Sequence, residues 1–553
     1  MRRQPVNGAL VGGLMTAPLM ALLYLGEQWW GLPFVPFDLF DWLARVLPGD
    51  VIRATIKTMV NLITELDLGE TSSTAKRLET LAALLQFLGG GVILGAFYFA
   101  LRERLSLPAG ETSRRIAALA LGLAFGLPLI LISADINITT EISGLARDVA
   151  LLVLFVGWGF AVEWAYNSLR TQTATAISEA EAVRSPDAMP PATAERLSRR
   201  AFLVRVGTTT ATLTIAGAGI ARYLEVRDER EYRRRIERYR EVAVPAGLPN
   251  EDDPVTPAPG TRPEYTPLDD HYRIDINIRP LELDGETWRL DVHGLVDAPQ
   301  EFTLEQLRSE FEPLSQYVTL ACISNSVGGD LTSTTRWTGF RVADLLDAVG
   351  VQDEAGFLKI TSADGFYETV SIELARSDPR MMLAYEWDGI PLLHKHGFPL
   401  RIYVPDLYGM KQPKWITEIE VMAKDQDGYW VERSWDKVAQ MRATSVIDVV
   451  AADSLVERDG QTFVPIGGIA HAGARGISAV EVRVDEGEWM PAQLRAPLSE
   501  TTWAVWRYEW PFEAGKHRFE VRCYEGDGTL QSAERRPTFP SGATGIHRQS
   551  RDV

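Results

Sequence analysis

Two cysteines, Cys322 and Cys523, are the softest metal ligands in this 553-residue sequence. Cys322 ends an apolar run, 317–321, that is typical of a strand, and a stretch with two glycines, 327–329, follows closely. A thiolate suits a soft metal centre, and glycines let the backbone approach a bound group. A lone cysteine in an apolar run is otherwise a small buried hydrophobic residue. Cys523, within an alternating strand pattern, has that simpler interpretation.

A basic segment, GFPLRIYVPDLYGMKQPKW, follows at 397–415. Its cations and the polar side chains beside them could together bind a phosphate: Arg401, Lys411, Lys414, His396 and Gln412. The alternative is a solvated basic face. Arg401, however, alternates with apolar residues in a strand pattern, where an unpaired charge would be costly. This pattern argues against a merely solvated basic face.

Together with later segments, these motifs resemble the sulfite oxidase family over residues 264–547. The stretch YVTLACISNSVGGDLTSTTRWTGFRVADLL is similar to the segment carrying the metal ligand, and 397–421 is similar to the segment that binds the cofactor phosphate. PIGGIAHAGARGISAVEVRVDEGEW and PSGATGIH resemble the C-terminal immunoglobulin-like (Ig-like) domain. The resemblance implies oxo transfer at a mononuclear molybdenum held by molybdopterin and by Cys322, with a small-molecule substrate.

By position within the motifs, the resemblance also implies which residues form the site. The expected catalytic residues are Cys322 and Arg336, and the expected cofactor-binding residues are Tyr272, Arg273, Asn277, Cys322, Asn325, Thr361, His396, Arg401, Lys411, Gln412 and Lys414. One departure matters. Sulfite oxidases have an arginine soon after the cysteine, whereas here the nearest downstream arginine is Arg336. This weakens the expectation of sulfite and leaves reduction of sulfoxide-like or N-oxide-like substrates open.

The elements that must position these residues form two soluble domains. Residues 264–440 predict an α+β domain, with helices at 303–310 and 341–349 and a hairpin turn at Asp284-Gly285. Residues 441–553 predict an all-β, Ig-like sandwich. Its tryptophans suit a core or a dimer contact, so a homodimer is an open alternative. We expect no catalytic residue in this domain, with three exceptions that could reach the site: His471, Arg475 and Arg507.

Residues 1–167 predict a four-helix transmembrane domain. Apolar stretches at 8–25, 78–101, 116–133 and 149–166 are each long enough to span a bilayer, whereas 29–67 looks interfacial. Arginines before the first stretch and after the second place both ends of this domain in the cytoplasm, because short cytoplasmic loops are rich in basic residues.

A second targeting signal is expected in residues 168–225, a cytoplasmic linker followed by a fifth helix. Ser198-Arg199-Arg200-Ala201-Phe202-Leu203 precedes an apolar run at 206–221 and resembles the twin-arginine export signal. A stop-transfer flank is the alternative for the arginine pair. Export would place the catalytic domain on the outer side of the cell membrane, beyond a charged helix and Pro-rich linker at 226–263. If 206–221 is not a span, the enzyme instead faces the cytoplasm.

Composition excludes several function classes. A net charge of -18 argues against nucleic-acid binding, and two cysteines are too few for a Cys-ligated iron–sulfur cluster. No histidine precedes residue 271, so the four-helix domain cannot hold a bis-histidine haem. Electrons must therefore pass to or from a separate partner, an external cytochrome or a quinone-linked protein. A rival function is an exported Ig-like binding or adhesion module that has lost the cofactor.

Overall fold

The computed structural model describes residues 4–66, 68–104, 110–136, 144–182, 191–242 and 247–553. Arg2 and Arg3, the arginines before the first apolar stretch, lie outside these residues, as do parts of the two linkers, 183–190 and 243–246. The chain forms two compact units, Met1–Leu47 with Lys76–Arg235 and Pro48–Ala75 with Ile236–Val553.

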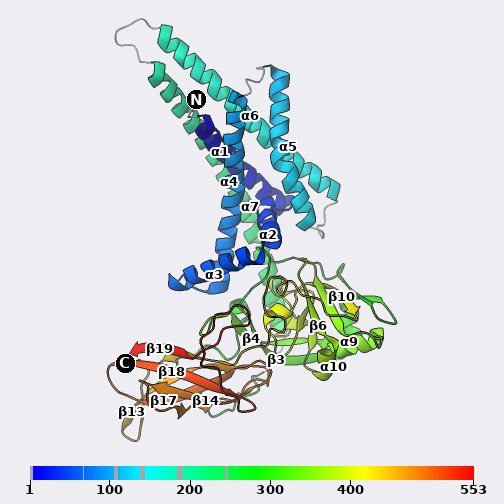
Figure 1. The fold of residues 1–553 in the computed structure, drawn as a ribbon, viewed down its shortest axis with the longest axis vertical. Helices are drawn as coiled ribbons and strands as arrows, with labels where there is room; N and C mark the ends of the chain where they lie inside the picture. The colour runs from blue at the N-terminus through cyan, green and yellow to red at the C-terminus, as the bar shows by residue number, and fades with distance from the viewer. Residues whose placement is uncertain (1–3, 67, 105–109, 137–143, 183–190, 243–246) are drawn as a thin grey trace. The chain divides into compact units, whose positions relative to one another are not determined.

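The first unit is helical (Figure 1). Its long helices are α1 (Gln4–Trp30), α4 (Thr71–Arg104), α5 (Glu111–Ile136), α6 (Gly144–Ala182) and α7 (Pro191–Val242), with the shorter α2 (Val35–Val46) after α1. Five segments are long and apolar enough to cross a membrane: Gln4–Trp30, Thr71–Arg104, Glu111–Ile136, Gly144–Gln172 and Arg200–Arg238. Each predicted span lies inside one of them. The charged stretch after the fifth span continues the same helix, α7, rather than starting a new one.

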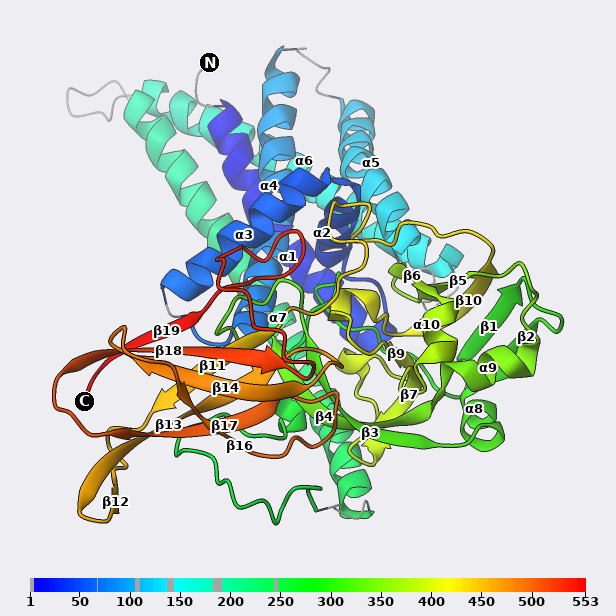
Figure 2. The same ribbon diagram turned by 60° about the horizontal axis from the view of Figure 1, so that its bottom comes forward.

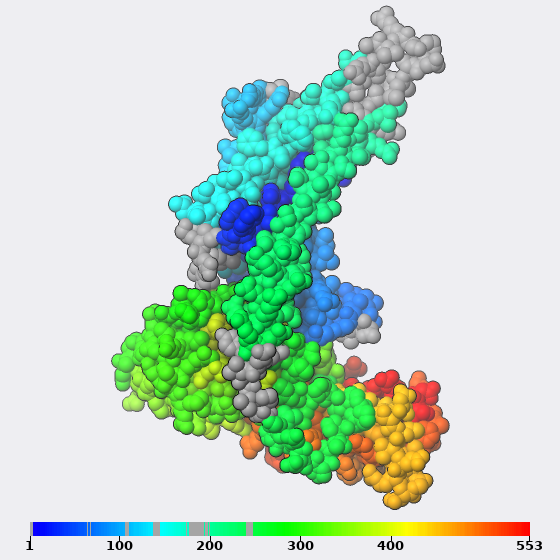
Figure 3. Space-filling model, turned by 180° about the vertical axis from the view of Figure 1, so that it is seen from behind, coloured from blue at the N-terminus to red at the C-terminus, as the bar shows by residue number. Residues whose placement is uncertain are grey.

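Small residues let these helices approach closely. A Cβ atom on Gly8 of α1 would collide with the carbonyl oxygen of Gly95 in α4. A Cβ on Gly217 of α7 would lie 3.2 Å from the Cβ of Ala21 in α1, and Figure 3 shows the two helices side by side. Such contacts are typical of helices that pack in a bilayer, where small residues permit dense van der Waals packing.

The second unit begins with α3 (Gly49–Glu65) and continues with the α+β domain. One sheet has the order β2 (Gln300–Thr303), β1 (Arg289–Gly294), β10 (Ile416–Met422), β5 (Phe357–Ser362) and β6 (Tyr367–Ser371). The other has the order β3 (Leu314–Ala321), β4 (Thr332–Arg341), β7 (Met382–Trp387) and β8 (Ile390–Pro391), and β9 (Arg401–Tyr403) pairs with β7. The helices are α8 (Leu304–Glu310), α9 (Val342–Val349) and α10 (Ile372–Ser377).

The two predicted helices of this domain are confirmed, but the hairpin at Asp284-Gly285 is wrong. Thr303 begins α8 with a capping box, its hydroxyl accepting from the backbone of Gln306 at 3.1 Å. At 284 the chain does turn, and Trp288 N donates to Asp284 O at 2.9 Å. No strand precedes that turn within 271–283. Polar residues there form ion pairs and hydrogen bonds near the candidate site instead of pairing with a partner strand: Arg273 pairs with Asp275, and Asn277 donates to Asp364.

The C-terminal domain is all β, as predicted (Figure 2). One sheet has the order β11 (Thr444–Val450), β13 (Gln461–His471), β17 (Ala504–Pro511) and β16 (Gln493–Leu494), and β12 (Val456–Arg458) pairs with β13. The other sheet has the order β15 (Met490–Pro491), β14 (Ile477–Val484), β18 (Lys516–Glu525) and β19 (His547–Asp552). Trp506 of one sheet and Val482 and Cys523 of the other share a fully buried core. Both cysteines are free and buried. The Ig-like identity of this domain stays a prediction.

The Pro-rich linker is bound along this C-terminal domain where the structure describes it. Arg495 pairs with Glu264 at 2.9 Å, and the indole of Trp503 donates to the backbone oxygen of the same residue at 3.0 Å. Arg262 pairs with Asp448 at 2.7 Å. Ion pairs therefore anchor the end of the linker, at Arg262, and the residue directly after it, Glu264.

Candidate active site

Cys322 stands at the end of β3, as the sequence predicts, and its backbone is held in place. Its N–H donates to Leu331 O at 2.9 Å, which extends the β3–β4 ladder by one residue. The thiol lies 3.0 Å from the Ser324 hydroxyl, and Asn325 Oδ1 accepts from Leu331 N at 3.0 Å, closing the loop. Cys322 is 9% exposed, and burial raises the pKa of its thiol. A metal ion would offset this cost by binding the thiolate.

Tyr272 connects the cysteine to the basic segment. Its N–H donates to Ser333 Oγ at 3.1 Å, and a Cβ on Gly409 would lie 3.2 Å from its hydroxyl oxygen. Burial raises the pKa of Tyr272, the nearby Cys322 raises it further and Arg401 opposes the rise. Tyr272 therefore lies within electrostatic reach of both the ligand cysteine and the buried arginine.

An aromatic cluster continues from Tyr272. The ring of His271 stacks on Tyr272 with centroids 5.4 Å apart and meets His396 at 4.9 Å, while Trp387 lies 4.4 Å from His396. Burial lowers the pKa of His271 to about 3 and that of His396 well below its ordinary value, so both rings are neutral at pH 7. The Nε2 atoms of both histidines are buried without a hydrogen-bond partner.

Arg401, in β9, is a buried cation without a carboxylate. It is 3% exposed, donates from Nη1 to His396 O at 2.9 Å and lies 4.3 Å above the ring of Trp337. Burial lowers the pKa of Arg401 to about 10, and its Nε has no hydrogen-bond partner. No ion pair of Arg401 occurs within the part of the chain that the structure describes. A buried guanidinium of this kind requires an anion.

The other predicted cations near the site already have partners. Lys411 pairs with Glu368 at 2.6 Å. Lys414 and Arg273 share Asp275, at 3.0 and 2.7 Å, which leaves this group with one net positive charge. Burial lowers the pKa of Lys414 to about 8.

Two predicted amides complete this side of the site. Asn277 Nδ2 donates to Asp364 Oδ2 at 3.1 Å. Gln412 Nε2 donates to Leu407 O at 2.8 Å, and its buried Oε1 has no hydrogen-bond partner. Gln412 thus keeps an acceptor for a ligand.

Arg336 and Thr361 are not brought together with Cys322. Arg336 pairs with Tyr317 across the β3–β4 hairpin, five positions before Cys322 in β3 and therefore roughly 17 Å from it by strand rise. Its backbone oxygen accepts from Asp388 N at 2.7 Å. Thr361 lies in β5, in the sheet that does not contain Cys322.

Sequence reasoning missed His271 and Trp387 near the predicted pterin ligands, and Ser324 beside the thiol. The one available signal for His271 was its position directly before Tyr272. Trp387 carries no motif, and only the packing of β7 brings it to His396. Ser324 lies in the segment that resembles the family's metal-ligand segment, but its contact with the thiol depends on how the loop after Cys322 turns.

Of the three C-terminal exceptions, two have structural partners of their own. Arg475 forms ion pairs with Asp406 and Glu525. Arg507 pairs with Glu509 at 2.7 Å. For His471, burial lowers the pKa to about 4.

A different C-terminal residue reaches the loop after Cys322. A Cβ on Gly328 would lie 2.6 Å from His547 Nε2, so the imidazole packs on the glycine backbone, which has a φ of 86°. His547 Nδ1 accepts from Ile447 N at 3.0 Å.

These features form a site for a polar, anionic ligand next to a soft metal ligand. Among the residues that the structure describes, buried donors and acceptors of His271, His396, Arg401 and Gln412 have no protein partner, and Arg401 has no counter-ion. A pterin heterocycle with a phosphate, together with a metal at the Cys322 thiolate, matches this donor set.

Comparisons with known proteins agree with this class. Residues 277–430 match the model of the oxidoreductase molybdopterin binding domain. The chain is 30% identical over 287 residues to mitochondrial sulfite oxidase of Macaca fascicularis, covering 44% of this chain and 52% of that protein. It is 27% identical over 320 residues to nitrate reductase [NAD(P)H] of Hordeum vulgare, covering 47% and 36%. It is 31% identical over 153 residues to the uncharacterized oxidoreductase YuiH of Bacillus subtilis, covering 27% and 73%.

The fold and the site thus define a molybdopterin-binding oxidoreductase domain. The chain belongs to the sulfite oxidase-type family of molybdopterin-dependent oxidoreductases. It spans about half the length of the sulfite oxidases that it matches, and its long helices lie outside the matched domain.

Proposed function

We propose that this protein is a membrane-anchored molybdenum-cofactor oxidoreductase that transfers an oxygen atom to or from a small molecule on the outer side of the cell membrane. The observation that carries the proposal is that one site contains both a buried metal ligand and a buried cation that requires an anion. Cys322 offers a buried soft ligand, and Arg401 is a buried cation that has no carboxylate partner among the residues that the structure describes. Tyr272 links the two. A degenerate binding module would have no reason to keep both.

Each residue of the site has a defined task in this proposal. The Cys322 thiolate holds the metal, and Arg401 balances the phosphate of the cofactor. The neutral His271 and His396 rings offer Nε2 atoms to the pterin, which their low pKa values keep uncharged. When bound, the cofactor supplies a two-electron redox centre with an exchangeable oxygen. The protein binds it, orients it and keeps water from its buried side.

The loop after Cys322 bears on the class of substrate. Ser324, Asn325 and Ser326 are uncharged, and Arg336 lies far along the hairpin. Uncharged residues directly after the metal ligand favour a neutral oxygen donor, such as a sulfoxide or an N-oxide, over anionic sulfite. The matched relatives include both an oxidase and a reductase by name, so relatedness alone favours neither direction.

The number of candidate spans supports this choice of side. Segment Pro48–Ala75 belongs to the same compact unit as Ile236–Val553. Arg53 donates to Arg433 O at 2.7 Å, and Thr71 N donates to Asp330 Oδ2 at 2.7 Å. That segment follows one candidate span and the catalytic domain follows five, so both counts are odd and place them on the same side. This agreement supports an odd number of spans before the catalytic domain, so a cytoplasmic N-terminus, as expected from the basic residues, would put that domain on the outer side.

The test is metal analysis of the full chain, purified in detergent from a host that makes molybdopterin. We expect about one molybdenum per chain and turnover of a sulfoxide or N-oxide with a reduced viologen dye. Cys322→Ser removes the soft ligand and should abolish turnover. Cys523→Ser changes the other buried cysteine, in the sandwich core, and is the matched control that should keep both metal and turnover. A metal-free wild-type protein or an active Cys322→Ser variant would refute the proposal.

A further inference from the structure

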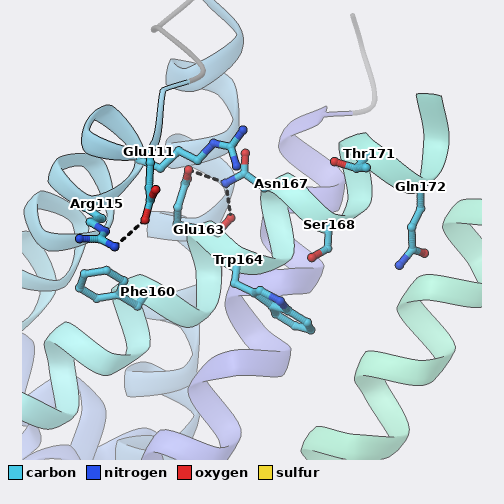
Figure 4. A pocket seen from close by; sticks show the side chains of 10 residues that line it. Glu111, Arg115, Phe160, Glu163, Trp164, Asn167, Ser168, Thr171 and Gln172 are labelled. Atoms are coloured by element: carbon cyan, nitrogen blue, oxygen red, sulfur yellow. Dashed lines mark hydrogen bonds and ion pairs between the residues drawn. The ribbon is translucent and has the colours of Figure 1, made fainter. Parts of the chain in front are cut away.

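A cavity of about 490 Å3 lies between α5 and α6 in the helical unit (Figure 4). Its volume is in the range of small-molecule sites. Arg114 and Arg115 line it from the first turns of α5, and Glu163, Trp164 and Asn167 line it from α6. By the distribution of basic residues, this is the cytoplasmic end of the helices.

The inner wall of the cavity contains a buried charge network. Glu163, whose side chain is 5% exposed, forms an ion pair with Arg102 of α4 at 3.0 Å. It also accepts from the Tyr98 hydroxyl and, at 2.6 Å, from Asn167 Nδ2. The Arg102 side chain is 4% exposed, and its Nε and Nη1 have no hydrogen-bond partner. Arg102 thus neutralises the negative charge of Glu163, and two of its N–H groups remain available as donors next to that carboxylate. Ionisable groups buried among membrane helices commonly mark a functional site.

The rim leaves one cation unbalanced. Glu111 pairs with Arg115 at 2.5 Å, one helical turn apart. Arg114, by contrast, has no ion pair within the part of the chain that the structure describes. Beside these charges, Phe160 and Trp164 are 42% and 57% exposed. A tryptophan such as Trp164 is typical of the level where headgroups meet acyl chains, and Phe160 adds apolar surface beside it.

We propose that this cavity binds the headgroup phosphate of an anionic phospholipid from the cytoplasmic leaflet. The phosphate pairs with Arg114, and the glycerol and first acyl carbons lie against Phe160 and Trp164. Basic pockets between membrane helices on the cytoplasmic side have this ligand chemistry. A quinone undergoing redox is a poorer fit, because no histidine in the helical unit could hold a haem to carry electrons there. The proposal rests on the membrane anchoring proposed above and is independent of the reaction at molybdenum.

The test is native mass spectrometry of the detergent-purified full chain, titrated with phosphatidylglycerol or phosphatidylcholine of identical acyl chains. We expect one phosphatidylglycerol per chain to be retained preferentially, and Arg114→Gln to weaken its binding about fivefold. Arg104→Gln is the matched control. It removes an exposed arginine from the end of α4, at the same end of the helices but outside the cavity, and should leave binding unchanged.

Three outcomes would overturn the proposal. These are equal binding of the two lipids, an equal loss in Arg104→Gln, and competition by millimolar inorganic phosphate, which would identify a free anion as the ligand. Membrane fractionation of each variant is a separate measurement. A chain that leaves the membrane fraction contradicts the anchor itself, whereas an anchored chain without lipid preference contradicts only the lipid site.

Discussion

Replacing Lys411 by methionine should destabilise the catalytic domain strongly, because it strands a buried carboxylate. Lys411 Nζ lies 2.6 Å from Glu368 Oε1, and the two side chains are 7% and 0% exposed. The other oxygen of Glu368 has no hydrogen-bond partner. Gly428 packs directly on this carboxylate, where a Cβ would collide with it. Water therefore cannot replace the ammonium group without displacing the chain.

The size of the effect is limited by protonation of Glu368. Neutralising a carboxyl group of ordinary pKa costs about 3.7 kcal/mol at pH 7 and about 1 kcal/mol at pH 5, at 1.36 kcal/mol per pH unit from a pKa of about 4.3. Breaking a buried pair typically costs about 3–5 kcal/mol, which agrees with this ceiling. We expect a loss of about 3 kcal/mol in the free energy of unfolding at pH 7.

The pH dependence has a definite sign. Burial already raises the pKa of Glu368, and Lys411 opposes that rise. Without Lys411 the folded-state pKa rises further above the unfolded value. A group with a raised folded pKa contributes stability that is full below its unfolded pKa and is lost as pH rises through the folded pKa. The deficit of Lys411→Met should therefore shrink between pH 7 and pH 5.

The assay is urea unfolding of the full chain in detergent, followed by hydrogen exchange in peptides from β6 and β10. Lys411→Met with Glu368→Leu removes both charges and should recover most of the stability. Lys437→Met, which breaks an exposed pair with Asp425, is the control and should change little. If Lys411 instead binds the cofactor phosphate, the double variant stays metal-depleted. The burial argument is refuted if the loss of unfolding free energy in Lys411→Met, relative to wild type, is the same at pH 7 and at pH 5.

Three further predictions follow from other parts of the chain. Lysines at both Arg199 and Arg200 should keep a C-terminal reporter inside the cell; an external, folded reporter would exclude the twin-arginine route. Gly328→Ala should lower turnover at least tenfold, because Gly328 has a φ of 86° and a Cβ there would meet His547 Nε2. Adding His547→Ala should restore part of the turnover, whereas unchanged kinetics in Gly328→Ala would show that the loop is free to shift. Arg475→Ala should lower thermal stability while turnover per bound molybdenum falls less than about tenfold; a hundredfold fall would assign this domain a part in catalysis.

The metal ligand and its supporting elements were predictable because their signals are local. The apolar run before Cys322 became β3, the glycines after it became a loop, and Thr303 began α8 as its capping pattern indicates. The expected catalytic role of Arg336 beside Cys322 shows where sequence alone falls short. Distance along the chain from Cys322 does not reveal that β4 returns antiparallel to β3 and carries Arg336 away from the loop.

The basic segment shows what composition alone leaves undecided. Arg401, Lys411 and Lys414 look equivalent in the sequence, and all three were expected to bind phosphate. The fold divides them, because Lys411 reaches Glu368 in β6 and Lys414 shares Asp275, partners far away in the sequence. Of these three cations, Arg401 alone has no carboxylate partner within the described part of the chain, so its desolvation is offset only if an anion binds. In a cluster of like charges, the cation left without a protein partner is therefore the one to assign to the ligand.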